Sequence, residues 1–134
     1  MKLRKRHEAI IAWEGESRDV IREFPEDVRS ELGIDLQLLQ WGEQPSSFRP
    51  MQSVGKGVFE LKQQDERSWY RVIYLSRIDD VIHVLHCFEK DSKKTPKKDI
   101  DLAKTRLKAV RLRLAEKKKQ QKLEKKKGGD HGKK

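Results

Sequence analysis

The spacing of apolar residues predicts helices in the first third of the chain. A short apolar run at 9–13 is typical of a strand, and Ser17 is a plausible N-cap for a helix that ends at Phe24. Pro25 suits the first position of a second helix, which Gly42 ends. One apolar stripe at helical spacing runs along that second helix: Val28, Leu32, Leu36 and Leu39.

After a loop rich in Pro, Ser and Gly, the apolar period changes from helical to two. Alternation over 58–62 predicts a strand, and the aromatic and β-branched segment 69–75 predicts a second. The segment 81–88 is the most apolar, so we expect it to be a central strand. Short polar turns separate the three, and they are therefore predicted to form an antiparallel meander.

A last helix is predicted from Lys97 or Lys98. Its apolar face is formed by Ile100, Ala103, Leu107, Val110 and Leu114. The predicted fold class is α+β: an N-terminal strand and two helices, then the three-stranded antiparallel meander, then the C-terminal helix. This domain spans residues 1–116. The tail 117–134 holds one apolar residue, Leu123, so we expect a fraying helix end and then a disordered arm.

Charge is distributed unevenly along the chain. The 134 residues carry 32 Lys and Arg against 22 Asp and Glu, a net +10, and a basic protein usually binds a polyanion. The tail has nine Lys against two acids, whereas residues 14–35 have eight acids against three bases. Residues 90–113 are basic, with ten bases against three acids. The tail is either a solubilising extension, partly added for expression, or a non-specific phosphate contact.

Composition also excludes several classes of protein. No stretch reaches the ~18 apolar residues of a membrane span, and no signal-peptide pattern is present, so a cytoplasmic location is expected. A single cysteine, Cys87, excludes an internal disulfide framework and a Cys-rich zinc site. The four His residues are scattered, so we expect neither a metal nor a cofactor.

The order of several segments resembles one family of proteins. FPEDVRSELGIDLQLLQWGEQP, VGKGVFELK, WYRVIY, VLHCFEKDSKKTP and DIDLAKTRL follow one another between residues 24 and 107. Together they resemble the phage-derived, HigB-like branch of the RelE/ParE toxin superfamily. The resemblance implies a small α+β toxin with a curved antiparallel sheet that binds the ribosome and cuts mRNA without a metal. It also implies a cognate antitoxin, often a helix-turn-helix DNA-binding protein.

Metal-free RNA cleavage uses the 2′-OH as nucleophile, and positive charge must stabilise the phosphorane-like transition state. Arg71 is the leading residue for this role, because it lies in an otherwise apolar strand whose face must then open to solvent or ligand. The resemblance supports it, since the Tyr-Arg strand carries a transition-state arginine in related ribonucleases. The alternative is an ordinary strand arginine or one paired with Glu60.

Lysines dominate the segment that follows the third strand. Lys90 is expected nearest the chemistry, and the phosphate-binding set that accompanies it comprises Lys93, Lys94 and Lys97. Family members often have a second base where Asp91 stands here, which weakens a two-lysine mechanism. The alternative is a solvated loop before a helix.

Other candidates have weaker support. Strand alternation places His86 with Val84 and Phe88, where it is either a catalytic acid or base or a structural histidine. Further RNA contacts are predicted at Lys56, in a glycine-flanked loop, at Lys62, and at Tyr70, which could stack on a base or belong to the core.

Three functions remain open from the sequence. The first is a ribosome-dependent mRNA endonuclease toxin. The second is a ParE-type toxin that inhibits gyrase by binding, and the third is a non-catalytic nucleic-acid binder in which the tail acts. Deletion of the tail would separate the first from the third, since a catalytic toxin should survive it with weaker binding.

Overall fold

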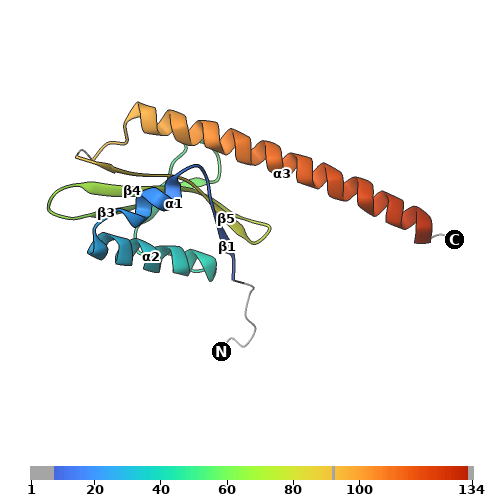
Figure 1. Cartoon of the computed structure of the whole chain (residues 1–134), viewed down its shortest axis with the longest axis horizontal. Helices are drawn as coiled ribbons and strands as arrows, with labels where there is room; N and C mark the ends of the chain where they lie inside the picture. The colour runs from blue at the N-terminus through green and yellow to red at the C-terminus, as the bar shows by residue number, and fades with distance from the viewer. Residues whose placement is uncertain (1–7, 92, 133–134) are drawn as a thin grey trace.

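A computed structural model describes residues 8–91 and 93–132, with side chains described up to residue 126. Helices cover both faces of one five-stranded sheet: α1 and α2 lie on one face, and α3 crosses the other (Figure 1). In chain order the elements are β1 (Ile10–Trp13), α1 (Ser17–Arg22), α2 (Glu26–Gln40), β2 (Phe48–Pro50), β3 (Val58–Gln64), β4 (Trp69–Ile78), β5 (Val81–Lys90) and α3 (Lys97–Gly132). The predicted class, α+β, is confirmed.

The strand order is β1-β5-β4-β3-β2. Strands β3, β4 and β5 pair antiparallel in sequence order, while β1 pairs parallel with β5 at one edge. β5 has a neighbouring strand on each side, β1 and β4, so the segment 81–88 is an interior strand, as expected. This segment is apolar because β1 covers its outer edge and helices cover both of its faces.

The predicted order of elements is incomplete, because the loop after α2 contains the additional strand β2. This strand has three residues and pairs antiparallel with β3 at the sheet edge. Pro50 is tolerated there since an edge strand leaves one side of its backbone unpaired. Such a short segment has too few residues to show alternation, and the proline argued against a strand.

Each face of the sheet packs its own hydrophobic core. Beneath α1 and α2 the buried residues include the helix stripe and the aromatic side chains: Phe24, Val28, Leu32, Leu36, Tyr70 and Tyr74. Beneath α3 they are mainly aliphatic: Val58, Ile73, Leu75, Leu85, Ala103, Leu107 and Val110. Residues of one strand thus alternate between two separate cores, as the pleat requires.

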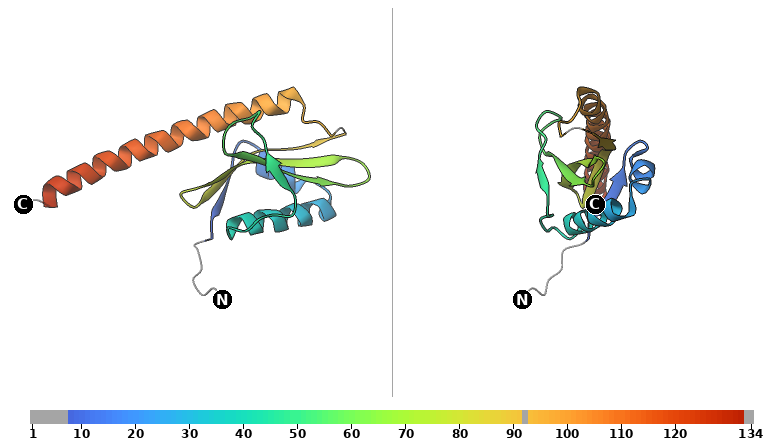
Figure 2. Two further views of the ribbon diagram at one scale, coloured as in Figure 1. Left: turned by 180° about the vertical axis from the view of Figure 1, so that it is seen from behind. Right: turned by 90° about the vertical axis from the view of Figure 1, so that its left-hand side faces the viewer.

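Helix α3 is longer than the face that it covers. Its first part buries Ala103, Leu107 and Val110 against the sheet, and its later part projects away from the sheet (Figures 1 and 2). The helix continues to Gly132, where the sequence indicated a fraying end and a disordered arm. Lys, Glu, Gln and Leu all favour helix, which explains the continuation without a core. The division into a domain 1–116 and a tail 117–134 stays a prediction.

Within the described residues, no helix combines the length and the apolar character needed to cross a bilayer.

Candidate active site

A group of polar side chains lies on the α3 face of the sheet, near the point where the chain leaves β5 and enters α3. Strand pairing assembles it, because Arg49 of β2 faces Glu60 of β3, and Lys62 of β3 faces Arg71 of β4. Successive side chains alternate between faces, so Glu60 and Lys62 share one face with their partners. Four residues from three strands therefore meet on one patch of the sheet.

Arg71 and Glu60 form a buried ion pair, with 0% of either side chain exposed. The Arg71 Nη1 lies 3.3 Å from one Glu60 carboxylate oxygen, and Arg49 Nε donates to the other at 2.9 Å. The Thr95 hydroxyl donates to Glu60 at 3.1 Å and accepts from Arg71 at 2.6 Å. Arg71 also donates to the Lys93 carbonyl. The expectation that this face opens to solvent is thus wrong for Arg71, because the segment before α3 covers it.

Lys62 extends the positive charge toward solvent. Its ammonium lies 4.9 Å from the centre of the Trp69 ring, a cation–π contact between β3 and β4. Partial burial lowers the pKa of Lys62, and the neighbouring charges of Arg49, Arg71 and Lys93 lower it further, against the opposing effect of Glu60. We call Arg49, Glu60, Lys62, Arg71 and Lys93 the cationic cluster; it contains four cations and one carboxylate. Such an excess of positive charge favours a phosphate ligand.

The predicted lysines fall into two groups. Lys90, at the end of β5, pairs in register with Trp69 and so lies at the same end of the sheet as the cationic cluster. Lys93 and Lys94 follow it and are exposed. Lys97 is also exposed and forms an i,i+4 ion pair with Asp101 in α3.

Lys56 is placed apart from this group. Its loop precedes β3 at the opposite end of that strand, and its carbonyl accepts a hydrogen bond from Arg111 of α3. The structure therefore does not bring Lys56 to the cationic cluster.

Tyr70 lies on the face of β4 opposite to Arg71. It is 1% exposed, its ring packs edge-on against Phe24 at 5.0 Å, and its hydroxyl donates to Asp65 at 3.1 Å. Burial raises the pKa of its phenol, with the Asp65 hydrogen bond acting in the same direction. Of the two possibilities for Tyr70, the structure favours the core residue. The aromatic side chain beside the cationic cluster is Trp69.

His86 is buried between β5 and α3. Its Nε2 lies 2.8 Å from the Asp99 carboxylate in the first turn of α3, and its ring stacks on Phe88 at 4.8 Å. Burial lowers the pKa of the imidazole, and the hydrogen bond to Asp99 opposes this shift. These contacts are those of a structural histidine that ties the start of α3 to the sheet. A catalytic role for His86 stays a prediction.

The expected alternation holds for His86 and Phe88 but is wrong for Val84, because β5 is irregular. Ile73 faces His86 and the next residue, Tyr74, faces Val84, so the register shifts by one residue between them. A bulge inserts an extra residue in one strand and changes which side chains share a face. Val84 consequently packs in the core under α1 and α2, while His86 and Phe88 lie under α3.

Three residues of this region were not identified from the sequence: Arg49, Thr95 and Asp99. Arg49 lay in a segment read as a loop, so it had no predicted strand partner. Thr95 belongs to the segment FEKDSKKTP, which contributes to the resemblance to the toxin family. This resemblance was the one signal that could have identified Thr95 as a site residue. Asp99 became significant only when α3 packed over β5.

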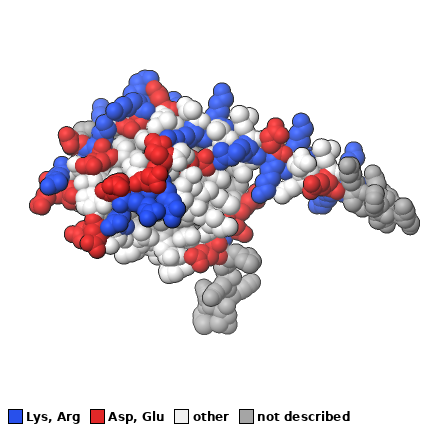
Figure 3. Space-filling view, in the orientation of Figure 1, with Lys and Arg blue, Asp and Glu red and all other residues white. Residues whose placement is uncertain are grey.

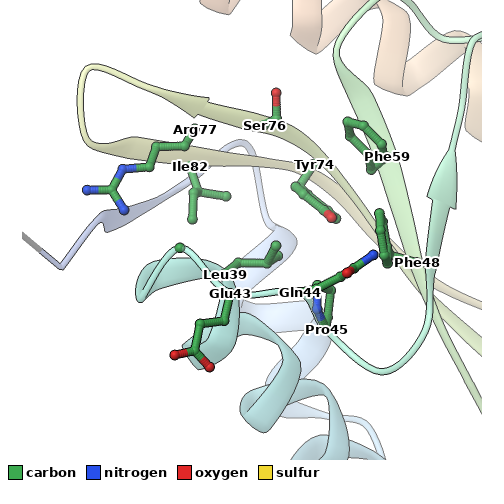
Figure 4. Close-up of a pocket in the computed structure, with 11 residues that line it drawn as sticks. Leu39, Glu43, Gln44, Pro45, Phe48, Phe59, Tyr74, Ser76, Arg77 and Ile82 are labelled. Atoms are coloured by element: carbon green, nitrogen blue, oxygen red, sulfur yellow. The ribbon is translucent and has the colours of Figure 1, made fainter. Parts of the chain in front are cut away.

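A separate apolar pocket lies on the other face of the sheet, near the end of α2 (Figure 4). Its volume is about 280 Å³, and its apolar walls are Leu39, Pro45, Phe48, Phe59, Tyr74 and Ile82. Burial raises the pKa of the Tyr74 phenol. The pocket suits an apolar side chain and does not share the chemistry of the cationic cluster. Among the described residues, no group of three or more His, Cys, Asp or Glu is placed to hold a metal ion.

The sequence of the region that contains this site matches a known protein family. Residues 19–108, which include the whole cationic cluster, match the family described as Phage derived protein Gp49-like (DUF891). The chain belongs to this family. The Gp49-like family is part of the RelE/HigB-like toxin group, which supports a toxin-like identity and implies an antitoxin partner. No curated protein matches the chain.

Proposed function

We propose that this Gp49-like protein is the toxin of a type II toxin–antitoxin system and acts as a metal-independent endoribonuclease on mRNA at the ribosome. The observation that carries the proposal is the cationic cluster, where Arg49 and Arg71 contact the single carboxylate and two lysines add positive charge nearby. Membership in a family associated with RelE-like endoribonuclease toxins supports the same reaction.

In the proposed reaction the 2′-oxygen attacks the adjacent phosphorus, and the bond from phosphorus to the 5′-oxygen breaks. A proton leaves the 2′-OH and another reaches the departing 5′-oxygen. Arg71 and Lys62 stabilise the negative charge that grows on the phosphate oxygens, and Lys90 binds beside them. Trp69, whose ring is partly exposed beside Lys62, offers a face on which a base can stack.

Glu60 has a definite place in this proposal. Its carboxylate accepts hydrogen bonds from Arg49, Arg71 and Thr95, which are the donors that a substrate phosphate would use. A phosphate that binds Arg71 therefore takes over contacts now made by Glu60, Thr95 or the Lys93 carbonyl. The pair with Glu60 orients the Arg71 guanidinium in the absence of RNA.

The test is cleavage of a defined mRNA with and without programmed ribosomes, including low-magnesium controls. Lys62→Gln and Arg71→Lys should lower the ribosome-dependent rate by about 10²–10³, the loss found when one transition-state donor is removed. Arg29→Gln is the matched control, because Arg29 is exposed on α2, across the sheet. Thermal unfolding of each variant separates lost activity from lost fold.

Each outcome directs the interpretation. Ribosome-dependent cleavage that Arg29→Gln retains and Lys62→Gln loses supports the proposal. Cleavage of naked RNA would replace it with a free ribonuclease, and cleavage unaffected by both cluster variants would remove the cluster from the mechanism. No cleavage, together with inhibition of gyrase supercoiling, would point to the ParE-type activity. Nucleic-acid binding without either activity would leave the non-catalytic binder.

A further inference from the structure

The two flanks of α3 differ in how their charges are matched. On the flank toward α1 and β1, Arg106 lies 2.6 Å from the Glu16 carboxylate, and Arg113 lies 2.9 Å from that of Glu14. Both arginines are therefore neutralised by the acidic early segment of the same chain. These ion pairs join α3 to the segment between β1 and α1.

The opposite flank carries a row of unmatched cations, which we call the basic stripe: Lys104, Lys108, Arg111, Lys119, Lys122 and Lys126. The steps between neighbours are four, three, eight, three and four residues, so all six lie on one side of the helix, with Ala115 filling the middle step. At 1.5 Å per residue the stripe is about 33 Å long. All six residues are exposed.

The chain supplies almost no counter-charge to the basic stripe. Residues 104–126 contain eleven Lys and Arg against two acids, Glu116 and Glu124. Within the described residues, none of the five stripe lysines forms an ion pair, and Arg111 donates to a backbone carbonyl. Figure 3 shows several blue side chains, with white and red ones between them, on the described part of α3 that projects beyond the sheet. Like charges one turn apart destabilise a helix by about 0.2–0.5 kcal/mol per pair, so a bound anion would stabilise this part of α3.

The composition of the helix indicates which polyanion fits. No Phe, Tyr or Trp occurs in α3, so this surface has no aromatic ring on which the bases of a single strand could stack. Lysines contact phosphates without reading sequence. A long row of cations on a helix instead matches the regular phosphate backbone of a duplex.

We infer that the basic stripe binds the phosphate backbone of double-stranded RNA. The choice of RNA rests on the proposed function, because the stripe belongs to the helix whose first turn follows the cationic cluster directly in the chain. Duplex RNA held along α3 would keep an adjacent single strand close to Arg71. The stripe extends beyond the residues that match the family, which end at 108.

The direct test measures binding of a labelled RNA duplex longer than the stripe by fluorescence anisotropy, between ~50 and ~200 mM salt. The stripe variant carries Lys108→Gln, Lys119→Gln and Lys122→Gln. The control variant carries Arg18→Gln, Arg29→Gln and Lys117→Gln, which remove the same charge from exposed positions outside the stripe. We expect the stripe variant to bind at least about tenfold more weakly and to lower the salt slope by about 2–3, one for each lost phosphate contact. The control should lower affinity far less.

Three results would overturn the inference. They are unchanged duplex binding by the stripe variant, an equal loss in the control variant, or tighter binding of the DNA duplex or the single-stranded RNA of the same sequence. Far-ultraviolet circular dichroism of both variants shows whether α3 remains helical.

Failure of this inference is distinguishable from failure of the proposed function. Duplex binding needs no cleavage, so the anisotropy measurement gives a result whether or not the protein cuts mRNA at the ribosome. Stripe-dependent RNA binding without ribosome-dependent cleavage would refute the proposed function alone. Cleavage by a protein whose stripe variant binds duplex normally would refute the stripe alone.

Discussion

Replacing Glu60 by alanine should destabilise the fold strongly, because it removes the carboxylate that faces the buried charge of Arg71. Both side chains are 0% exposed, and removing one member of such a buried pair costs about 3–5 kcal/mol. Arg71 keeps its hydrogen bonds to Thr95 and to the Lys93 carbonyl, so we expect the lower end, about 3 kcal/mol. Loss of the Arg49 contact adds little, because that side chain is 53% exposed and a surface ion pair contributes about 0–1 kcal/mol.

Urea unfolding followed by circular dichroism measures this loss. With a slope of about 1–3 kcal/mol per molar urea, a loss of 3 kcal/mol moves the midpoint of Glu60→Ala by roughly 1–3 M. Arg49→Ala should move it by a third of that or less. Glu60→Gln, which keeps the acceptor oxygen but not the charge, should fall between the two. A loss below about 1 kcal/mol for Glu60→Ala, or one equal to that of Arg49→Ala, would refute the buried pair as the element that holds Arg71.

Other positions give independent tests. Gly33→Ala should raise the free energy of unfolding by about 0.5–1 kcal/mol, because a Cβ in this helix interior meets no atom within 4 Å. Gly57→Ala should lower it by about 1–2 kcal/mol, because φ is +80° there; equal effects of the two substitutions in urea unfolding would contradict both. Cys87 is buried with a raised thiol pKa, so a thiol reagent should modify it only after unfolding. The pKa of His86 is lowered in the folded protein, so as pH falls the unfolded chain binds a proton at this residue before the folded chain does. The stability due to the neutral ring is therefore lost as pH falls below the ordinary pKa of about 6.5. His86→Gln should lose less stability over the same pH range.

The fold was predictable wherever burial of one face repeats along the sequence. In each such element the apolar positions of the sequence are the ones that pack in a core. This holds for the stripe on α2, the alternation in β3 and β4, and the apolar face of α3. Strand β2 has no such pattern, because it is three residues long and two of its residues are exposed. The length of α3 was also missed, because the argument for disorder considered burial and gave too little weight to the helix propensity of lysine and glutamate.

The candidate site was predictable in its residue types but not in its arrangement. Arg71 could be selected because a charged residue in an apolar strand must have a reason to be there. A pair with Glu60 was one of the alternatives that the sequence offered, and the structure contains it. The choice between the alternatives depended on the register of β3 against β4 and on the hydrogen bonds of Thr95, and no local sequence pattern determines either. The face of the sheet on which His86 lies relative to Val84 depended on a bulge in β5. The alternation rule assumes a regular strand, so it could not predict this bulge.

Arg71 is buried and paired with Glu60, yet this arrangement is compatible with the proposed binding of a phosphate. The reason is that the single charge of Glu60 does not neutralise the four cations of the cationic cluster. One carboxylate faces the charges of Arg49, Lys62, Arg71 and Lys93. Burial lowers the pKa of Lys62, and the charges of Arg49, Arg71 and Lys93 lower it further. A second anion placed among them would relieve that repulsion and return the pKa of Lys62 toward its ordinary value. Any ligand that binds the folded chain in this way also stabilises it against unfolding. The same excess of charge that makes the cluster costly to fold therefore favours the phosphate that the proposed reaction requires.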